Sequence, residues 1–427
     1  MTTSLRRTLT TPLLFLFILG DVLGAGVYVL AGQMAAEVGG AVWIPLVVAL
    51  CLALLTAASY AELATKYPRA GGAAHYTNLA FGPFVGFVIG FCMLAAGIVS
   101  VGALARAFGG QYLAEFVTVP VALAAVLFLA ALALLNIRGI RESLRANAVA
   151  TLVEVSGLVI VVVLGAWVVL RGDGDVGRLV QVGTAEHGPL AGILAGTVLA
   201  YYSFVGFETS VNLAEETRDP RRTYPRALFG ALICAGVGYA LVGAAASATV
   251  PTERLAGPDG SLLDVVKIAG GVPESVFSVI ALVAVANGAL LTGIMSSRLA
   301  YGMARDGLLP GVLARVLPGR RTPWVAIVVT TVLSMSLALT GDVATLAATL
   351  VLLLLVVFIA VNAAVLRLRS REGEEADHFR TPAVVPVLAI LSCLMLLTRI
   401  EGEVWLRGLP VLAVGVVLGL VSAARLR

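Results

Sequence analysis

Long apolar runs, separated by short segments rich in proline, glycine and charge, extend along the whole chain. A helix that spans a bilayer needs about 20 predominantly apolar residues, and the windows of that kind predict twelve spans. The pattern therefore predicts an all-α integral membrane protein with about twelve transmembrane helices. The predicted spans cover residues 12–33, 41–64, 84–107, 120–136, 147–170, 189–212, 224–250, 273–303, 323–340, 343–366, 382–398 and 406–424.

The composition excludes a soluble protein. Of the 427 residues, 59% are hydrophobic and only 13% are charged, and the mean hydropathy is +1.00. A soluble domain carries about 25% charged residues, so this amount of charge cannot cover a molecule of this size in water. No segment is both long and polar enough to form a soluble domain. We expect contacts with the lipid bilayer and no nucleic-acid partner.

The basic residues test the predicted topology independently. When the N-terminus is placed in the cytoplasm and the spans alternate, most of the 29 lysine and arginine residues fall in the inner loops, as the positive-inside rule requires. A miscounted span would invert every later loop and remove this asymmetry. We therefore expect a multi-pass protein of the plasma or inner membrane with both termini in the cytoplasm. The apolar run after Arg6 and Arg7 is interpreted as a retained first span, because no clear cleavage site follows it.

Two predicted spans carry helix-weakening segments near their middle. Span one contains Gly-Asp-Val-Leu-Gly-Ala-Gly at residues 20–26, and span six contains Tyr-Tyr-Ser-Phe-Val-Gly-Phe-Glu at residues 201–208. Irregular backbone at membrane depth is tolerated only inside protein or beside a cavity. Taken singly, each glycine cluster also fits close packing of helices. Two clusters at matching positions, on spans that start from opposite sides, favour an inverted repeat of five spans with binding at the midplane.

Four segments follow one another in the order known from a family of transporters. They are Gly-Ala-Gly-Val-Tyr-Val-Leu-Ala-Gly at 24–32, Tyr-Pro-Arg-Ala-Gly-Gly and a later tyrosine at 67–76, the segment 206–227 with Glu-Glu-Thr-Arg-Asp-Pro, and the segment 298–310. Together they resemble the amino acid–polyamine–organocation permeases, most of all their cationic amino acid transporter branch. The last four spans contribute only hydropathy to the resemblance.

The resemblance implies a fold of the leucine-transporter type, with broken helices 1 and 6 in a 5+5 inverted repeat. Residues 1–366 are then a ten-helix transport core, with repeats at about 12–170 and 189–366. Residues 367–427 add two peripheral transmembrane helices. The implied activity is the transport of amino acids or related amines.

The predicted breaks offer complementary groups for a zwitterion. The helix that restarts after Gly26 points free N–H groups and a positive dipole end toward the midplane, where they suit a carboxylate. The half-helix that ends near Ser203 leaves carbonyls unpaired, and these, with Asp21, suit an ammonium group. The predicted substrate-binding residues are Asp21, Gly24, Ala25, Gly26, Tyr202, Ser203, Phe204 and Gly206.

Three acids lie at predicted membrane depth, namely Asp21, Glu154 and Glu208. Ionisable residues inside a membrane are functional candidates by default, and a proton-coupled transporter needs a carboxyl group that binds and releases a proton. Glu154 and Glu208 are the candidates for proton coupling, and the alternative for each is a protonated acid bonded to a neighbouring helix. In several members of the family a lysine stands at the position of Glu154. This departure puts a lysine-based coupling scheme in doubt here.

A small polar stripe of Gly288, Thr292 and Ser296 recurs every four residues on span eight. It favours close packing of helices over the alternative, a sodium site as in sodium-coupled relatives. The histidines do not cluster, and the four cysteines lie in separate apolar runs as small core residues. We therefore predict no metal site and no cofactor.

The sequence thus predicts a secondary active transporter of amino acids, driven by protons. An exchanger, or a carrier of polyamines or other amines, remains the alternative. A membrane enzyme would need paired catalytic residues at one face, and a channel would need a continuous polar stripe. Neither pattern is present.

Overall fold

The computed structural model describes residues 10–68, 71–138, 144–184, 188–257, 261–320, 322–370 and 378–425. Helices form almost all of the regular structure in these residues, and the β-structure among them is one isolated antiparallel bridge between Gly39 and Val182. Arg6 and Arg7, which enter the orientation argument, lie outside the described residues. The prediction of an all-α chain is confirmed.

Each predicted span corresponds to one or two helices. The first five are α1 (Thr11–Val22) with α2 (Gly26–Val38), α3 (Trp43–Lys66), α5 (Pro83–Phe108), α7 (Val121–Arg138) and α8 (Leu144–Leu170). The next five are α9 (Pro189–Tyr202) with the 3-10 helix η2 (Ser210–Glu216), α10 (Pro220–Thr249), α13 (Glu274–Arg305), α14 (Trp324–Thr340) and α15 (Val343–Arg369). The last two are α16 (Val384–Leu397) and α17 (Gly402–Arg425).

Short helices connect these spans. They are α4 (Gly72–Phe81), α6 (Gln111–Ala114), η1 (Val176–Val180), α11 (Thr252–Leu255), α12 (Leu263–Ala269) and η3 (Gly311–Ala314). Within the described residues, 8 helices are long and apolar enough to cross a membrane, and the α1–α2 pair forms a further span that is bent by 44°. The helices α9, α14 and α16 are apolar but shorter. Together these elements account for the predicted number of about twelve spans.

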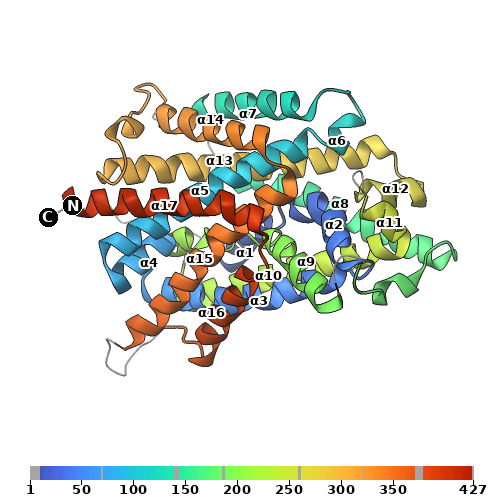
Figure 1. The fold of residues 1–427 in the computed structure, drawn as a ribbon, viewed down its shortest axis with the longest axis horizontal. Coiled ribbons are helices and arrows are strands. Elements are labelled where there is room, and N and C mark those ends of the chain that lie inside the picture. The colour runs from blue at the N-terminus through green and yellow to red at the C-terminus, as the bar shows by residue number, and fades with distance from the viewer. Residues whose placement is uncertain are drawn as a thin grey trace.

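The order of the elements repeats along the chain. In each half, a broken span and a straight span are followed by short helical segments and then by three further spans. The short helix of the first half, α4, lies at one end of the bundle, and α11 and α12 of the second half lie at the opposite end (Figure 1). This arrangement is what an inverted repeat produces. The exact division into residues 1–366 and 367–427 stays a prediction.

The helices differ strongly in how far they are buried. In the most apolar stretch of α15, 67% is buried, because this helix packs against α3, α4, α5, α9, α16 and α17. In the corresponding stretches of α7 and α17, only 22% is buried. Since their exposed residues are mostly leucine and valine, these two helices present apolar faces that suit lipid. The core therefore surrounds the two broken spans, with α7 along one edge in Figure 1 and α17 packed on α5 and α15.

Two details differ from the sequence-based expectation. The break of span six lies after Tyr202 as predicted, but the part of the span beyond it forms turns and then a 3-10 helix from Ser210, and not a second α-helix. The cysteines are not all core residues: Cys92 and Cys393 are buried, but Cys51 and Cys234 are exposed on helix surfaces. A thiol is small and apolar enough to face lipid as well as a core.

Candidate functional site

The two helix breaks are in direct backbone contact. A Cβ atom added to Gly26, the first residue of α2, would lie 2.6 Å from the Cα atom of Ser203. A Cβ atom added to Gly206 would lie 2.7 Å from the carbonyl oxygen of Asp21, and Gly206 also has a φ of +127°. Each break thus places a glycine against the backbone of the other break. Only glycine fits at both points.

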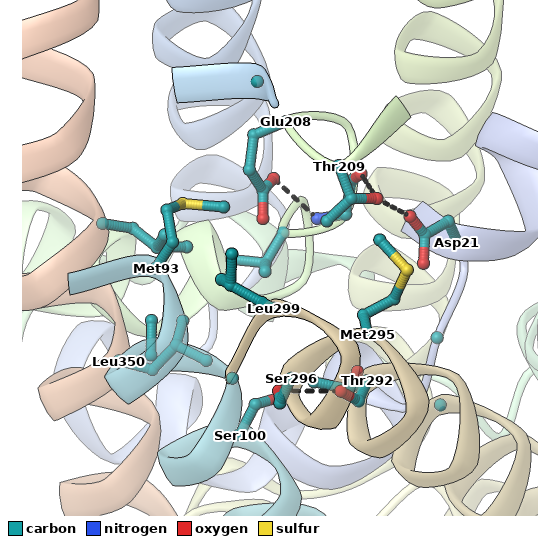
Figure 2. Close-up of a pocket in the computed structure, with 18 of the residues that line it drawn as sticks. Asp21, Met93, Ser100, Glu208, Thr209, Thr292, Met295, Ser296, Leu299 and Leu350 are labelled. Atoms are coloured by element: carbon teal, nitrogen blue, oxygen red, sulfur yellow. Dashed lines mark hydrogen bonds between the residues drawn. The ribbon is translucent and has the colours of Figure 1, made fainter. Parts of the chain in front are cut away.

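A cavity of about 190 Å³ lies at this crossing. Its volume is below the 300–1,000 Å³ typical of sites for drug-sized ligands, so it suits a small molecule. Its walls come from both broken spans and from α4, α5, α13 and α15, whose side chains converge in Figure 2. The predicted residues that line it are Asp21, Gly24, Ala25, Gly26, Tyr202, Ser203, Gly206 and Glu208.

The backbone at the cavity carries unpaired groups of both signs. The first turn of α2 has no side-chain cap, and Gly24, Ala25 and Gly26 line the cavity at that end. Among the described residues, no backbone N–H donates to the carbonyl oxygens of Ser203, Phe204 or Val205 beyond the end of α9. A positive helix end beside free carbonyls matches a ligand that has an anionic and a cationic group.

Two carboxyl groups form part of this wall. The Thr209 hydroxyl donates to Asp21 Oδ2 at 2.5 Å, and the Gly206 N–H donates to Glu208 Oε2 at 2.9 Å (Figure 2). Among the described residues, no lysine or arginine forms an ion pair with either acid. The cavity therefore has acidic groups without a protein cation to balance them.

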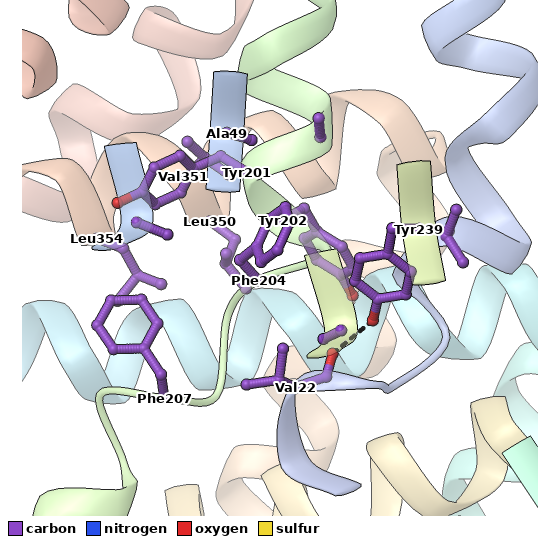
Figure 3. Close-up of a cluster of buried hydrophobic side chains, with 14 of the residues drawn as sticks. Val22, Ala49, Tyr201, Tyr202, Phe204, Phe207, Tyr239, Leu350, Val351 and Leu354 are labelled. Carbon is purple, nitrogen blue, oxygen red and sulfur yellow. Dashed lines mark hydrogen bonds between the residues drawn. The ribbon is translucent and has the colours of Figure 1, made fainter. Parts of the chain in front are cut away.

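Phe204 is not among the residues that line the cavity. It is fully buried, and its ring packs edge-on against Tyr239 with the ring centroids 5.5 Å apart (Figure 3). The Tyr239 hydroxyl in turn donates to the carbonyl oxygen of Val22 at 2.7 Å, at the end of α1. The structure thus places Phe204 in the aromatic core that supports the break, on the side away from the cavity.

Glu154 also lies outside the cavity wall. Its side chain is 0% exposed, and its Oε1 accepts a hydrogen bond from Asn287 on α13 at 3.1 Å. Its Oε2 has no hydrogen-bond partner among the described residues. Its backbone carbonyl accepts a bond from the hydroxyl of Tyr28 at 2.6 Å. Glu154 is therefore a buried acid that joins α8, α13 and the first turns of α2.

The stripe on span eight contributes to the wall and to packing at once. Gly288, Thr292 and Ser296 all line the cavity. The Ser296 hydroxyl donates to the Thr292 carbonyl at 2.8 Å, and a Cβ atom on Gly97 of α5 would lie 2.1 Å from Ser296 Oγ. The tight contact between α5 and α13 agrees with the packing interpretation.

Sequence reasoning missed several residues of the wall. Thr209 and Asn212 follow the motif of span six but carry no pattern of their own. Met93 and Ser100 lie on α5, whose sequence is almost entirely apolar, and Met295 lies beside the stripe on α13. For Thr209 and Asn212, the one indication in the sequence was their position a few residues after Gly206.

Comparison with known proteins agrees with this architecture. The amino acid permease family matches residues 9–410 of the chain. A branched-chain amino acid permease of Bacillus subtilis is 28% identical over 97% of this chain and 92% of its own length. A methylthioribose transporter of the same organism is 27% identical over 96% and 92%. Cationic amino acid transporter 4 of Mus musculus is 33% identical over 90% of this chain and 63% of its own length.

These matches cover both broken spans and the helices that line the cavity. They agree with the resemblance seen in the four sequence motifs, and the matched proteins are transporters and not enzymes. The chain therefore belongs to the amino acid permease family of multi-pass membrane transporters.

Proposed function

We propose that this permease is a secondary active transporter that moves an amino acid across the plasma or inner membrane, coupled to protons. Transport proceeds by alternating access, and both termini lie in the cytoplasm. The observation that carries the proposal is the cavity at the crossing of the two breaks. There, the uncapped start of α2 and the free carbonyls after α9 lie on one small wall. This wall complements the carboxylate and the ammonium group of an amino acid.

The substrate class follows from the cavity more than from the relatives. The matched proteins are named for branched-chain amino acids, for methylthioribose and for cationic amino acids, at similar identities. Asp21 and Glu208 give the cavity an acidic character that suits a cationic group. Met93, Leu104 and Leu350 supply an apolar part of the wall for a side chain. A cationic or neutral amino acid is the substrate we propose, and an amine or polyamine carrier, or an exchanger, is the alternative.

Proton coupling is proposed because, within the described part of the chain, Asp21, Glu154 and Glu208 form no ion pair with a lysine or arginine. Placing an unpaired carboxylate away from water is unfavourable, and a bound proton removes the charge. Glu208 is 3% exposed and sits two residues beyond Gly206 in the break of span six. Glu154 lies outside the cavity wall, on the side of α8 that contacts α13. Sodium coupling through the stripe on α13 is the alternative.

Uptake into proteoliposomes tests the proposal. The full chain is reconstituted, and radiolabelled L-leucine, L-arginine and putrescine are offered with an inward proton gradient, an inward sodium gradient or neither. We expect accumulation of at least one amino acid with the proton gradient only. Accumulation of putrescine alone would select the amine carrier, and uptake that needs an internal amino acid would select the exchanger. No flux of any of the three compounds would contradict the proposal.

A further inference from the structure

The cavity borders two segments that face each other at one end of the bundle. Gly71 and the first turn of α4 form one side, and Thr209 and Asn212 of span six form the other. Gly71 is exposed, and Asp21, Thr209 and Asn212 are half-buried. Gly71 therefore gives one way into the cavity, between these two segments at the end of the bundle where α4 lies (Figure 1), and the other exposed residue of the wall is Met295 on α13. We call the opening at Gly71 the mouth.

Beyond Gly26, the first turn of α2 leads from the cavity wall into a group of aromatic side chains that lies outside that wall. Tyr28, Tyr112 and Phe277 are all buried, and the Tyr112 hydroxyl donates to the Tyr28 carbonyl at 2.7 Å. The ring of Phe277 lies 6.0 Å from that of Tyr28 and 6.2 Å from that of Tyr112. Access to the cavity past Gly71 depends on the width of the mouth.

Three hydrogen bonds connect the cavity acid to the far side of the mouth. The Thr209 hydroxyl donates to Asp21 Oδ2 at 2.5 Å. The Asn212 Nδ2 group donates to the Thr209 carbonyl at 3.0 Å. The Gly71 N–H then donates to Asn212 Oδ1 at 3.0 Å and so crosses the mouth. The side-chain amide of Asn212 is used in both directions, as donor to its own segment and as acceptor from α4.

The local backbone explains why an amide from another segment is needed here. Gly71 has a φ of +125° and Gly72 a φ of +49°, and the start of α4 has no side-chain cap of its own. Asn212 supplies the acceptor at that point. Because Gly71 is exposed, its N–H can also bond to water when Asn212 moves away. A neutral bond of this kind shifts an equilibrium by about 2- to 10-fold, which suits a contact that forms and breaks in each transport cycle.

We propose that Asn212 is a positioning residue that holds the mouth partly closed and links it to the state of Asp21. The proposal rests on the proposed function, in which an ammonium group binds near Asp21. A cation at Asp21 competes with the Thr209 hydroxyl, releases Thr209, and loosens the hold of Asn212 on Gly71. Loading of the cavity then changes the width of its mouth.

Thiol labelling tests the connection without any substrate or ion gradient. The four native cysteines are replaced by alanine, and Val205→Cys, at a half-buried position in the cavity wall, serves as reporter in lipid nanodiscs. The labelling rate with a charged methanethiosulfonate reagent is compared for Asn212→Ala, Thr209→Val, Thr209→Ser and the double variant Asn212→Ala/Thr209→Val. The matched control is Asn136→Ala, which removes a bond to Ser297 between α7 and α13 outside the cavity wall.

We expect Asn212→Ala and Thr209→Val each to label about 2- to 10-fold faster than the parent. The double variant should label no faster than the faster single variant, because both changes break one connection. Thr209→Ser and Asn136→Ala should label at the parental rate. Parental rates in both single variants, or effects that multiply in the double variant, would overturn the proposal.

A second variant protects the test against misfolding. If Asn212→Ala is not recovered as monodisperse protein, Asn212→Leu keeps the approximate size of the side chain and removes both of its hydrogen bonds without adding a charge. Faster labelling in this variant supports the connection, and parental labelling contradicts it. Since no amino acid is present, the result does not depend on whether the uptake experiment succeeds.

Discussion

Single residues at the crossing of the breaks decide whether a ligand can approach the backbone. Gly26 and Gly206 are required because backbone of the other span lies under 3.0 Å from where a Cβ atom would be. Asp21 has a different role, since its side chain forms part of the wall and accepts from Thr209. Each of these roles leads to a substitution with a distinct outcome.

Replacing Gly26 by leucine should abolish uptake while the protein still reaches the membrane. The new side chain would collide with Ser203 at 2.6 Å and fill the space where the helix end meets the ligand, and overpacking costs about 1–3 kcal/mol. We expect initial uptake to fall at least about 10-fold, measured in proteoliposomes at equal protein content. Gly238→Leu is the matched control, because nothing lies within 4 Å of a Cβ atom at Gly238 on α10. Unchanged kinetics in Gly26→Leu would remove span one from the site.

Replacing Asp21 by asparagine should weaken L-arginine uptake more than L-leucine uptake. The amide keeps the size and can still accept from Thr209, but the attraction to a cation is lost, and that attraction is stronger at low effective dielectric than in water. We expect the ratio of kcat/KM for the two substrates to change by about 10-fold or more. An equal loss for both substrates would instead place the α-ammonium group that both share beside Asp21, or assign Asp21 to coupling or structure.

At the scale of elements, a buried ion pair between α3 and α15 also holds the segment that leads into α16. Glu62 at the end of α3 accepts two bonds from Arg369 at the end of α15, and it also accepts from the Thr381 N–H ahead of α16. The side chains of Glu62 and Arg369 are only 2% and 12% exposed. The segment that leads into α16, the first of the helices predicted as peripheral, is therefore held at a defined place on α3 and α15.

Glu62→Gln should lower the stability of the fold. Removing one partner of a buried ion pair leaves the other charge uncompensated, which costs about 3–5 kcal/mol in soluble proteins. Thermal unfolding in detergent should therefore begin several degrees lower than in the parent. Glu403→Gln is the matched control, since the Glu403–Arg407 pair on α17 is exposed and such pairs contribute about 0.3–0.5 kcal/mol. Equal Tm values for Glu62→Gln and the parent would show that hydrogen bonds alone hold the junction.

At the scale of the whole molecule, transport requires that binding in the cavity and proton release be linked to the same conformational change. Glu208 lies in the irregular part of span six, beside the cavity and the mouth. Glu154 lies away from the mouth, where Asn287 connects α8 to α13. The two acids therefore occupy elements with different surroundings, and their roles can be separated by experiment.

Removing the coupling acid should uncouple transport without abolishing binding. Glu208→Gln and Glu154→Gln are each reconstituted and compared with and without an inward proton gradient. The variant that lacks the coupling acid should still exchange amino acid across the membrane, but should lose accumulation driven by the gradient. If both variants still concentrate substrate, neither acid is the coupling group, and stimulation by sodium would assign the role to the stripe on α13.

The sequence by itself determined the elements and their approximate ends. A bilayer accepts only backbone whose polar groups are satisfied within the span, so apolar windows of sufficient length must be helices. The same constraint makes glycines and an acid at membrane depth informative, and the breaks at Gly26 and after Tyr202 lie where the sequence predicted them. The order of the elements along the chain was also fixed by hydropathy and charge.

Only the tertiary structure decided which side chains face the cavity. Phe204 and Ser203 are neighbours, yet one packs in the aromatic core and the other lines the wall. In a turn between half-helices there is no helical period from which a side chain's direction can be derived. The contact of Asp21 with Thr209 joins residues 188 positions apart, and Glu154 meets Asn287 on another helix. Such contacts depend on how the spans cross, and the hydrophobic pattern of each single span carries no information about that crossing.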